Sequence, residues 1–559
     1  MRAWLIGVGF VAALALAACW FVFGYWWDNS WRMWQDFHWS VVVGTFVPNG
    51  FNVFQATWVF YLLVGLVVIG IGAFFANAIE SALGGLTVVF GVILVIAAIV
   101  VAIVAIPHKE ASYAGKTTLV VEDLDKPPAS LQFLMDSVQA SSGEECDLVG
   151  TTRGITSCIV EEEIDLEWEP RPASATAARN KLVRASEGDT FSYVMTDTIN
   201  YSKTAQGNYW SAIRDGKKKK PIDGVLTWDG TASNPSKCEF AGDHELNYAF
   251  KGSWGTNLAD LIAKEYHDHL YDQNDMWGYC VDGKPVIAIP TVKREGYKHV
   301  ATDRFGGLLL VTGSPSGEPV FELVENVSAG DYPGPVYPSS LAERQRDSFK
   351  MSAGVLDKWL RGFGMEASSV SSQMGNSSEF LLESAKDGRL YWVTPLKPAK
   401  GDSQRITTYS VIPADAATSG ELNDQTMYMH SDINEMVDLP TMQDRVTNEI
   451  NAKEPAFFGG DPAGRLAEFL PLTSDTWQVY AERGGTVVYR IQISTNEALR
   501  PEVVKLSGAT GSPVDTGNSD DGQEGAPTLN CSSDAAAMAV IDLSECMKMY
   551  SDELARRAG

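Results

Sequence analysis

Apolar residues follow different patterns on the two sides of residue 109. Residues 82–107 contain no charged side chain, and a helix of that length, at about 1.5 Å per residue, can cross a hydrocarbon core of roughly 30 Å. Two more apolar segments precede it, at residues 3–27 and 57–78. The pattern predicts a membrane domain over residues 1–109 that spans a lipid bilayer with three transmembrane helices.

The first apolar segment has two further interpretations. It resembles the apolar core of a signal peptide, and the run Leu16-Ala17-Ala18-Cys19 matches the lipobox of bacterial lipoproteins. A lipoprotein normally becomes polar soon after its cysteine, whereas this run stays apolar to Trp27. An uncleaved helix is therefore favoured, while cleavage and lipidation of Cys19 stay open.

Beyond residue 109, short runs of alternating apolar and polar residues are separated by glycine and proline, which is typical of strands and turns. Asp-Gly or Gly-Gly pairs at 282–283, 387–388 and 484–485 lie between such runs and predict hairpins. Four segments have a helical pattern, and they cover residues 173–186, 257–271, 341–363 and 440–451. The predicted fold class is α+β, with three N-terminal transmembrane helices followed by a large extracytoplasmic body of antiparallel sheets and packed helices.

The hairpins recur roughly 100 residues apart, which indicates repeated α+β units, although chance recurrence of common turns remains an alternative. We expect two extracytoplasmic α+β regions, at residues 110–345 and 346–506. Residues 507–530 have almost no bulky apolar side chain and predict a flexible linker. We expect residues 531–559 to form a C-terminal helix.

The cysteines indicate disulfides. One, Cys19, lies in the first apolar segment and six lie in the body, an even number without a C-x-x-C motif, which favours disulfides over zinc. The expected pairs are local in sequence: Cys146 with Cys158, Cys238 with Cys280, and Cys531 with Cys546. These disulfides would place the body outside the cytoplasm and the N-terminus inside it, so the protein would be a multi-pass protein of the cell membrane. The alternative is a cytoplasmic body with six unpaired thiols.

The formal net charge of −26 argues against nucleic acid as a partner, because binding to phosphates needs a basic surface. A protein or envelope component remains as the expected partner, and the oligomeric state is open. Acidic residues at alternate positions of one predicted strand share a face: Glu161, Glu163, Asp165 and Glu167. A solvated strand face is favoured over calcium binding there, because no D-x-D-x-D-G loop is present.

The best cluster of potential metal ligands lies at the end of the segment 257–271 and directly after it, and it contains Glu265, His267, Asp268, His269 and Asp272. On one helix, His267 and His269 would point about 200° apart, and the H-E-x-x-H motif is absent. The chain also lacks a phosphate-binding loop, a dinucleotide-binding glycine motif and a nucleophile elbow. We therefore predict no catalytic residue, no metal and no cofactor.

Part of the body resembles a group of membrane proteins. The runs CEFAGDHELNYAFKGSWGTNLADLIA, NDMWGYCVDGKPVIAIP and GPVYPSSLAERQRDS, within residues 210–349, are similar to uncharacterised membrane proteins of actinobacteria and of their plasmids and phages. The resemblance implies a bacterial or phage-encoded envelope protein. It implies no activity, and no functional residue is carried over.

These observations favour a membrane-anchored extracytoplasmic protein that binds or regulates a protein or envelope component without catalysis. A membrane-anchored cell-envelope hydrolase is the alternative, and it would need a cleft that joins His244, His267 or His269 to an acidic partner. A plasmid- or phage-borne role in exclusion or transfer is compatible with the first prediction.

Overall fold

The computed structural model describes residues 113, 116–123, 151–152, 155–187, 189, 191–204, 207–217, 220–232, 234–250, 252, 255–266, 269–295, 302–349, 364–368, 379–399, 405–430, 437–496 and 498–506. Contacts group residues 1–513 into one compact unit and residues 514–559 into a second. All described residues belong to the first unit. The predicted linker at 507–530 and the predicted helix at 531–559 lie outside them.

The fold of the described residues is mostly β, with 47% in strands and 18% in helices, so the predicted α+β class is wrong. Helices occur close to the predicted positions, but tertiary pairing shortens one of them. The predicted helix at 257–271 is α6, Leu258–Glu265. It ends early because the chain then pairs with a neighbouring strand through β9, His269–Leu270.

No helix within the described ranges is long and apolar enough to cross a membrane. This finding contradicts the predicted membrane domain and multi-pass location. The three segments on which those predictions rested, at residues 3–27, 57–78 and 82–107, lie outside the described residues.

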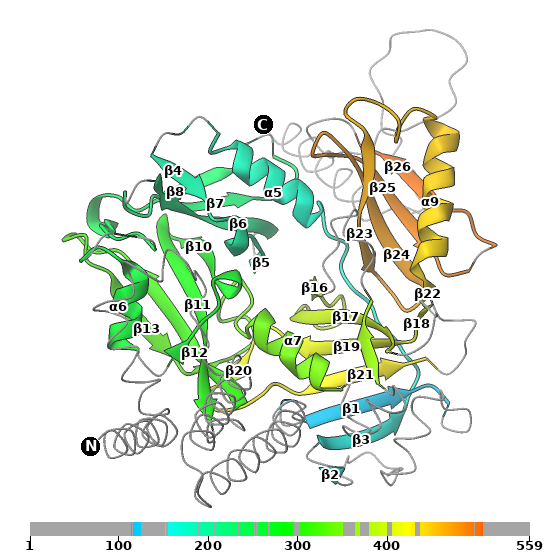
Figure 1. Cartoon of the computed structure of the whole chain (residues 1–559), viewed down its shortest axis with the longest axis horizontal. Coiled ribbons are helices and arrows are strands. Elements are labelled where there is room, and N and C mark those ends of the chain that lie inside the picture. The colour runs from blue at the N-terminus through cyan, green and yellow to red at the C-terminus, as the bar shows by residue number, and fades with distance from the viewer. Residues whose placement is uncertain are drawn as a thin grey trace, which may run out of the picture. The chain divides into compact units, whose positions relative to one another are not determined.

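Three of the four larger sheets follow a helix in the chain, whereas the eight-stranded sheet takes three strands from before the first described helix and five from after the third (Figure 1). The first helix is α5, Ala175–Arg184, whose N-cap Ser174 accepts a hydrogen bond from the backbone N–H of Ala177. Its buried face packs beside β6 and β7. The sheet that follows contains β4 Ser192–Val194, β5 Asn200–Thr204, β6 Gly207–Gly216, β7 Gly224–Trp228 and β8 Ser236–Glu239.

The second helix, α6, has Asn257 as its N-cap and buries Leu258 and Ile262. Its sheet consists of β9, β10 Trp277–Val281, β11 Lys284–Glu295, β12 Thr302–Thr312 and β13 Val320–Val324. The predicted hairpin at 282–283 is confirmed between β10 and β11. Asp282 and Gly283 have φ values of 51° and 76°, the left-handed conformations that a two-residue hairpin turn requires.

The third helix, α7 Ser339–Ser348, lies across an eight-stranded mixed sheet (Figure 1). The predicted helix at 341–363 corresponds to it, although residues 350–363 lie outside the described ranges. The position between residues 345 and 346, where we expected two regions to meet, falls within α7. The strands of this sheet are β1 Lys116–Val121, β2 Thr151–Thr152, β3 Ile155–Glu161, β15 Met365–Ala367, β16 Phe380–Glu383, β17 Leu390–Pro398, β19 Thr408–Pro413 and β21 Gln425–Met429.

The N-terminal strand β1 lies inside this sheet and runs parallel to both β21 and β3. Strands β1 to β3 precede the sheets of β4–β8 and β9–β13 in the chain, and the other strands of the eight-stranded sheet follow them. The eight-stranded sheet therefore joins segments that are distant in sequence. The predicted turn at 387–388 lies in the connection between β16 and β17. Two short pairs complete the described strands, and they are β14 Asn326–Val327 with β20 Ala417–Thr418, and β18 Arg405–Ile406 with β22 Val437–Asp438.

The fourth helix, α9 Leu439–Lys453, corresponds to the predicted helix at 440–451 and lies along its own four-stranded sheet (Figure 1). Met442, Val446 and Ile450 of α9 belong to the same buried core as the strands. The predicted hairpin at 484–485 is confirmed between β24 and β25. The strands are β23 Gly464–Pro471, β24 Thr476–Arg483, β25 Thr486–Ser494 and β26 Glu502–Lys505.

Candidate functional site

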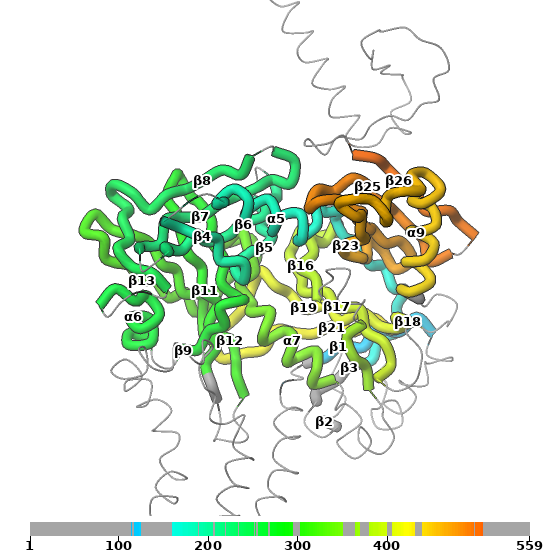
Figure 2. Tube along the Cα trace, turned by 45° about the horizontal axis from the view of Figure 1, so that its top comes forward, coloured from blue at the N-terminus to red at the C-terminus, as the bar shows by residue number. Residues whose placement is uncertain are grey.

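An extended segment after β3, residues 162–170, connects two of these sheets, and we call it the strap. Figures 1 and 2 show it as the cyan chain that leads from β3 past β16 and β23 to α5. The backbone N–H of Trp168 donates to the carbonyl of Leu472, 2.7 Å away, and the N–H of Glu169 donates to the carbonyl of Glu383, 2.8 Å away. Its backbone is thus held from both sides.

Side chains of the strap alternate between the core and the surface. Ile164, Leu166 and Trp168 are buried, each at most 6% exposed, as expected for every second residue of an extended chain. The acidic residues between them and at the end of β3 are exposed: Glu161, Glu162, Glu163, Asp165, Glu167 and Glu169. The prediction that Glu161, Glu163, Asp165 and Glu167 form a solvated face is confirmed.

Among the residues that the structure describes, most of these carboxylates have no positive neighbour within ion-pair distance. Asp165 forms an ion pair with Lys386, and both side chains are exposed. Within the described ranges, the other five acidic residues form no ion pair. The strap therefore carries a row of largely uncompensated negative charge on a fixed extended backbone, and this row would attract a positively charged ligand.

The end of the strap is anchored by a buried arginine. Arg171 is 4% exposed, and its guanidinium carbon lies 5.3 Å from the ring centroids of both Tyr201 and Trp210, within the range of a cation–π interaction. Its Nη2 donates a hydrogen bond to the carbonyl of Leu381. Arg171 thus contacts β5, β6 and β16.

Two buried glutamates from the fourth sheet complete this anchor. Glu468 Oε2 lies 3.7 Å from Arg171 Nη1, and Glu468 Oε1 accepts from the backbone N–H of Ala175 at 2.7 Å. Ser174 donates to Glu482, which also accepts from Arg465 at 3.1 Å. Both glutamates lie near the N-terminus of α5, where the helix dipole favours negative charge.

The ionisation of Glu468 is perturbed by its surroundings. Burial raises the pKa of Glu468 from 4.5 to about 7, although the positive charge of Arg171 opposes this shift. The residue also has a φ of 50° at an irregularity between Ala467 and Phe469, a conformation that is uncommon outside glycine. The bulge aims an ionisable carboxyl group into the interior.

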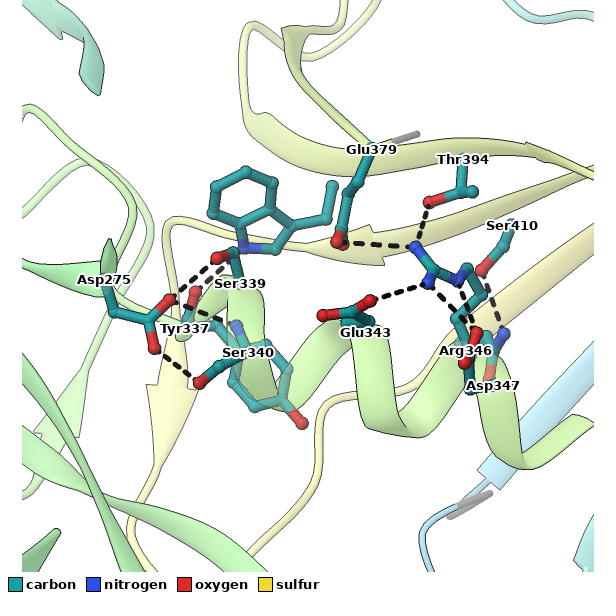
Figure 3. A network of polar contacts seen from close by, with 12 residues as sticks. Asp275, Tyr337, Ser339, Ser340, Glu343, Arg346, Asp347, Glu379, Thr394 and Ser410 are labelled. Atoms are coloured by element: carbon teal, nitrogen blue, oxygen red, sulfur yellow. Dashed lines mark hydrogen bonds and ion pairs between the residues drawn. The ribbon is translucent and has the colours of Figure 1, made fainter. Parts of the chain in front are cut away.

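A second buried network fixes α7 on the eight-stranded sheet (Figure 3). Arg346 Nη1 lies 3.5 Å from Glu379 Oε2 and donates to Thr394 Oγ1 at 3.3 Å. Burial raises the pKa of Glu379 to about 8. At the start of α7, the carboxylate of Asp275 accepts from Ser339 Oγ at 2.7 Å and from the N–H of Ser340 at 3.1 Å, so it caps the helix from another part of the chain.

The structure does not bring the predicted ligand cluster together on a helix. Glu265 ends α6, His269 is buried in β9, and Asp272 precedes a 3₁₀ turn. His267 and Asp268 lie outside the described residues. The described part of the chain contains no group of three or more His, Cys, Asp and Glu side chains that could hold a metal ion.

Histidine and cysteine are otherwise dispersed. His244 belongs to an exposed 3₁₀ turn, Gly242–His244. Cys238 and Cys280 are free thiols in β8 and β10, and each influences the pKa of the other. Cys158 lies in β3 without a described side chain, and the remaining predicted disulfide residues, Cys146, Cys531 and Cys546, lie outside the described ranges, as does Cys19.

No family model, no curated protein and no solved structure matches this chain. The candidate site therefore depends on its geometry alone. The resemblance to actinobacterial membrane proteins stays a prediction.

Neither buried network is predicted by the sequence patterns. Arg171, Glu468 and Glu482 are distant in sequence, and no spacing rule connects them. A signal was nevertheless present, because Glu468 interrupts the apolar run LAEFLPL, and charged residues in apolar strands are seldom buried without a partner.

Proposed function

We propose that this chain is a non-catalytic binding protein whose strap docks an extended, basic segment of a partner protein. The observation that carries the proposal is the row of exposed carboxylates on a backbone that is hydrogen-bonded from both sides. The overall charge of −26 supports it, since long-range attraction of a basic partner accelerates association.

The spacing of the charges favours an extended ligand. Glu163, Asp165, Glu167 and Glu169 are exposed at every second position, so neighbouring charges lie about 6.5 to 7 Å apart along an extended chain. A partner strand with lysine or arginine at alternate positions has the same period. Because the strap is already ordered, binding would not require it to lose further conformational freedom.

Mutual repulsion also distinguishes the strap from an ordinary solvated surface. Like charges at this spacing destabilise the folded state by a few tenths of a kcal/mol per pair, and Lys386 compensates for Asp165 alone among the six. A bound basic segment would relieve this repulsion. The same field repels phosphate groups, which favours a protein over a nucleic acid as the partner.

A charge-neutralised strap provides the test. The test uses the triple variant Glu163→Gln, Asp165→Asn and Glu167→Gln and a fluorescent ten-residue peptide of alternating lysine and threonine. The variant should bind this peptide roughly tenfold more weakly, because the attraction between one carboxylate and one lysine contributes about 0.5 kcal/mol. Fluorescence anisotropy with the full-length protein would measure the dissociation constant at low and at physiological ionic strength.

A matched control separates a local effect from net charge. Glu187, Glu322 and Glu421 are exposed and lie in three separate parts of the fold: after α5, in β13 and after β20. Replacing all three with glutamine therefore changes the charge by the same amount at positions outside the strap. We expect this control to change the dissociation constant less than twofold. Equal losses in the two triple variants would show that the peptide senses bulk charge only, and the proposed function would fail.

The hydrolase alternative needs a cleft that joins His244, His267 or His269 to an acidic partner. His267 lies outside the described residues, and no observation on His244 or His269 favours such a cleft. The hydrolase alternative is therefore not proposed.

A further inference from the structure

The two free thiols among the described residues lie on edge strands of two sheets that pack together. Cys238 lies in β8 at the edge of one sheet, and Cys280 lies in β10 at the edge of the next. Cys238 is 8% exposed and Cys280 is half-buried. Neither residue belongs to the strap or to the two buried charged networks.

The strand register explains why the thiols meet. Val225 of β7 is the direct neighbour of Cys238 in β8. Gly278 of β10 packs so closely against Val225 that a Cβ atom there would lie 2.6 Å from Val225 Cγ2. Cys280 is two residues from Gly278 on the same strand, so both face the same way. The close approach at Gly278 therefore brings Cys280 towards Cys238.

The pKa of both thiols is raised by burial, so their surroundings decide the order in which the two thiols ionise. Burial raises the pKa of Cys280, and a hydrogen bond to Cys238 and the charge of Cys238 add to this rise. Burial also raises the pKa of Cys238, while the hydrogen bond from Cys280 opposes that rise. The interaction between the two thiols therefore favours ionisation of Cys238 over ionisation of Cys280. Cys238 is consequently the thiol that ionises first.

We propose that Cys238 and Cys280 form a redox-active dithiol that closes into a disulfide when the protein meets a peroxide. The Cys238 thiolate attacks one oxygen of hydrogen peroxide, the O–O bond breaks, and hydroxide leaves, so that Cys238 becomes a sulfenic acid. Cys280 then attacks the sulfenic sulfur and water leaves as the S–S bond forms. The two thiols lose two electrons, and one peroxide becomes two water molecules.

The product would link β8 to β10 and therefore join two sheets covalently. Closing a loop of this length restricts the unfolded chain. The oxidised protein should accordingly unfold at a temperature roughly 5–10 °C higher than the reduced protein. This state would be reversible by a dithiol reductant.

Peptide mapping of the full-length protein tests the proposal directly. After exposure to hydrogen peroxide, free thiols are blocked with N-ethylmaleimide and the protein is digested with trypsin without reduction. The sequence places Cys238 in the tryptic peptide 238–251 and Cys280 in the peptide 265–293, each with a single cysteine. We expect the two peptides as one species, lighter than their sum by two hydrogen atoms and separable by dithiothreitol.

Two variants make the result specific. In Cys238→Ser, peptide 265–293 should carry N-ethylmaleimide after peroxide treatment, whereas Cys531→Ser should still give the linked species. The double variant Cys238→Ser with Cys280→Ser should show no peroxide-dependent rise in melting temperature. Recovery of both wild-type peptides as separate N-ethylmaleimide adducts or sulfinic acids, or linkage of either to another cysteine, would overturn the proposal. Neither result depends on binding at the strap.

Discussion

At the scale of single residues, the main feature of the described structure is that ionisable groups are buried with a defined partner. Arg171 stacks on two aromatic rings and faces Glu468, and Arg346 faces Glu379. Buried pairs of this kind contribute little net stability, because desolvation opposes their attraction. Removing one partner is costly, however, so each pair restricts how the surrounding elements can pack.

Glu468 should make stability depend on pH. Its pKa is raised to about 7 in the folded protein, while in the unfolded chain it ionises near its ordinary value of about 4.3. Between these values the folded state holds a proton that the unfolded state has released, so stability falls as pH rises through this window. The free energy of unfolding of the wild type should therefore decrease between pH 4.5 and pH 8. In Glu468→Gln we expect this decrease to be smaller by about 1–3 kcal/mol.

Urea unfolding at a series of pH values measures this difference. Glu379 has a raised pKa as well, but it is present in both proteins, so its contribution cancels in the comparison. The exposed residue Glu322 provides a control, since Glu322→Gln should follow the wild-type pH profile. Parallel profiles for Glu468→Gln and the wild type would show that Glu468 is already ionised at neutral pH.

At the scale of elements, the sequence predicted the turns and helices whose conformation depends on neighbouring residues in the chain. The two-residue turns at 282–283 and 484–485 follow from the freedom of Asp-Gly and Gly-Gly to adopt positive φ. Amphipathic periodicity located α6, α7 and α9. The end of α6 was missed because the pairing of β9 with β11 is a tertiary interaction, and the buried anchor of the strap was missed because its members are distant in sequence.

The start of α7 depends on a carboxylate from outside the helix. Asp275 accepts from Ser339 and Ser340 (Figure 3), and it is buried, so its loss would leave these donors unpaired. We expect Asp275→Ala to destabilise the protein by about 1–2 kcal/mol and to accelerate amide exchange in the first turn of α7. Asp275→Asn keeps a carbonyl acceptor and should cost less; similar losses in both variants would contradict the capping role.

At the scale of the whole molecule, segments distant in sequence hold the described sheets together. Strand β1 joins the C-terminal part of the eight-stranded sheet, and the strap is bonded to that sheet and to the sheet of β23–β26. Arg171 adds contacts with β5 and β6. Contacts with several parts of the chain therefore hold the strap rigid. This explains why its acidic residues can be exposed and still fixed in position.

Arg171→Met tests this dependence. Methionine fills a similar volume against Tyr201 and Trp210, but it leaves Glu468 without its positive neighbour, so we expect a loss of about 3–5 kcal/mol at pH 8 and an earlier midpoint of urea unfolding. Adding Glu468→Gln removes the unpaired charge and should restore part of the loss, as a double-mutant cycle would measure. If Arg171→Met unfolded at the wild-type midpoint, or if the second substitution gave no recovery, the Arg171–Glu468 pair would not hold the strap in place. The rigidity on which the binding proposal depends would then have to come from the backbone hydrogen bonds of the strap alone.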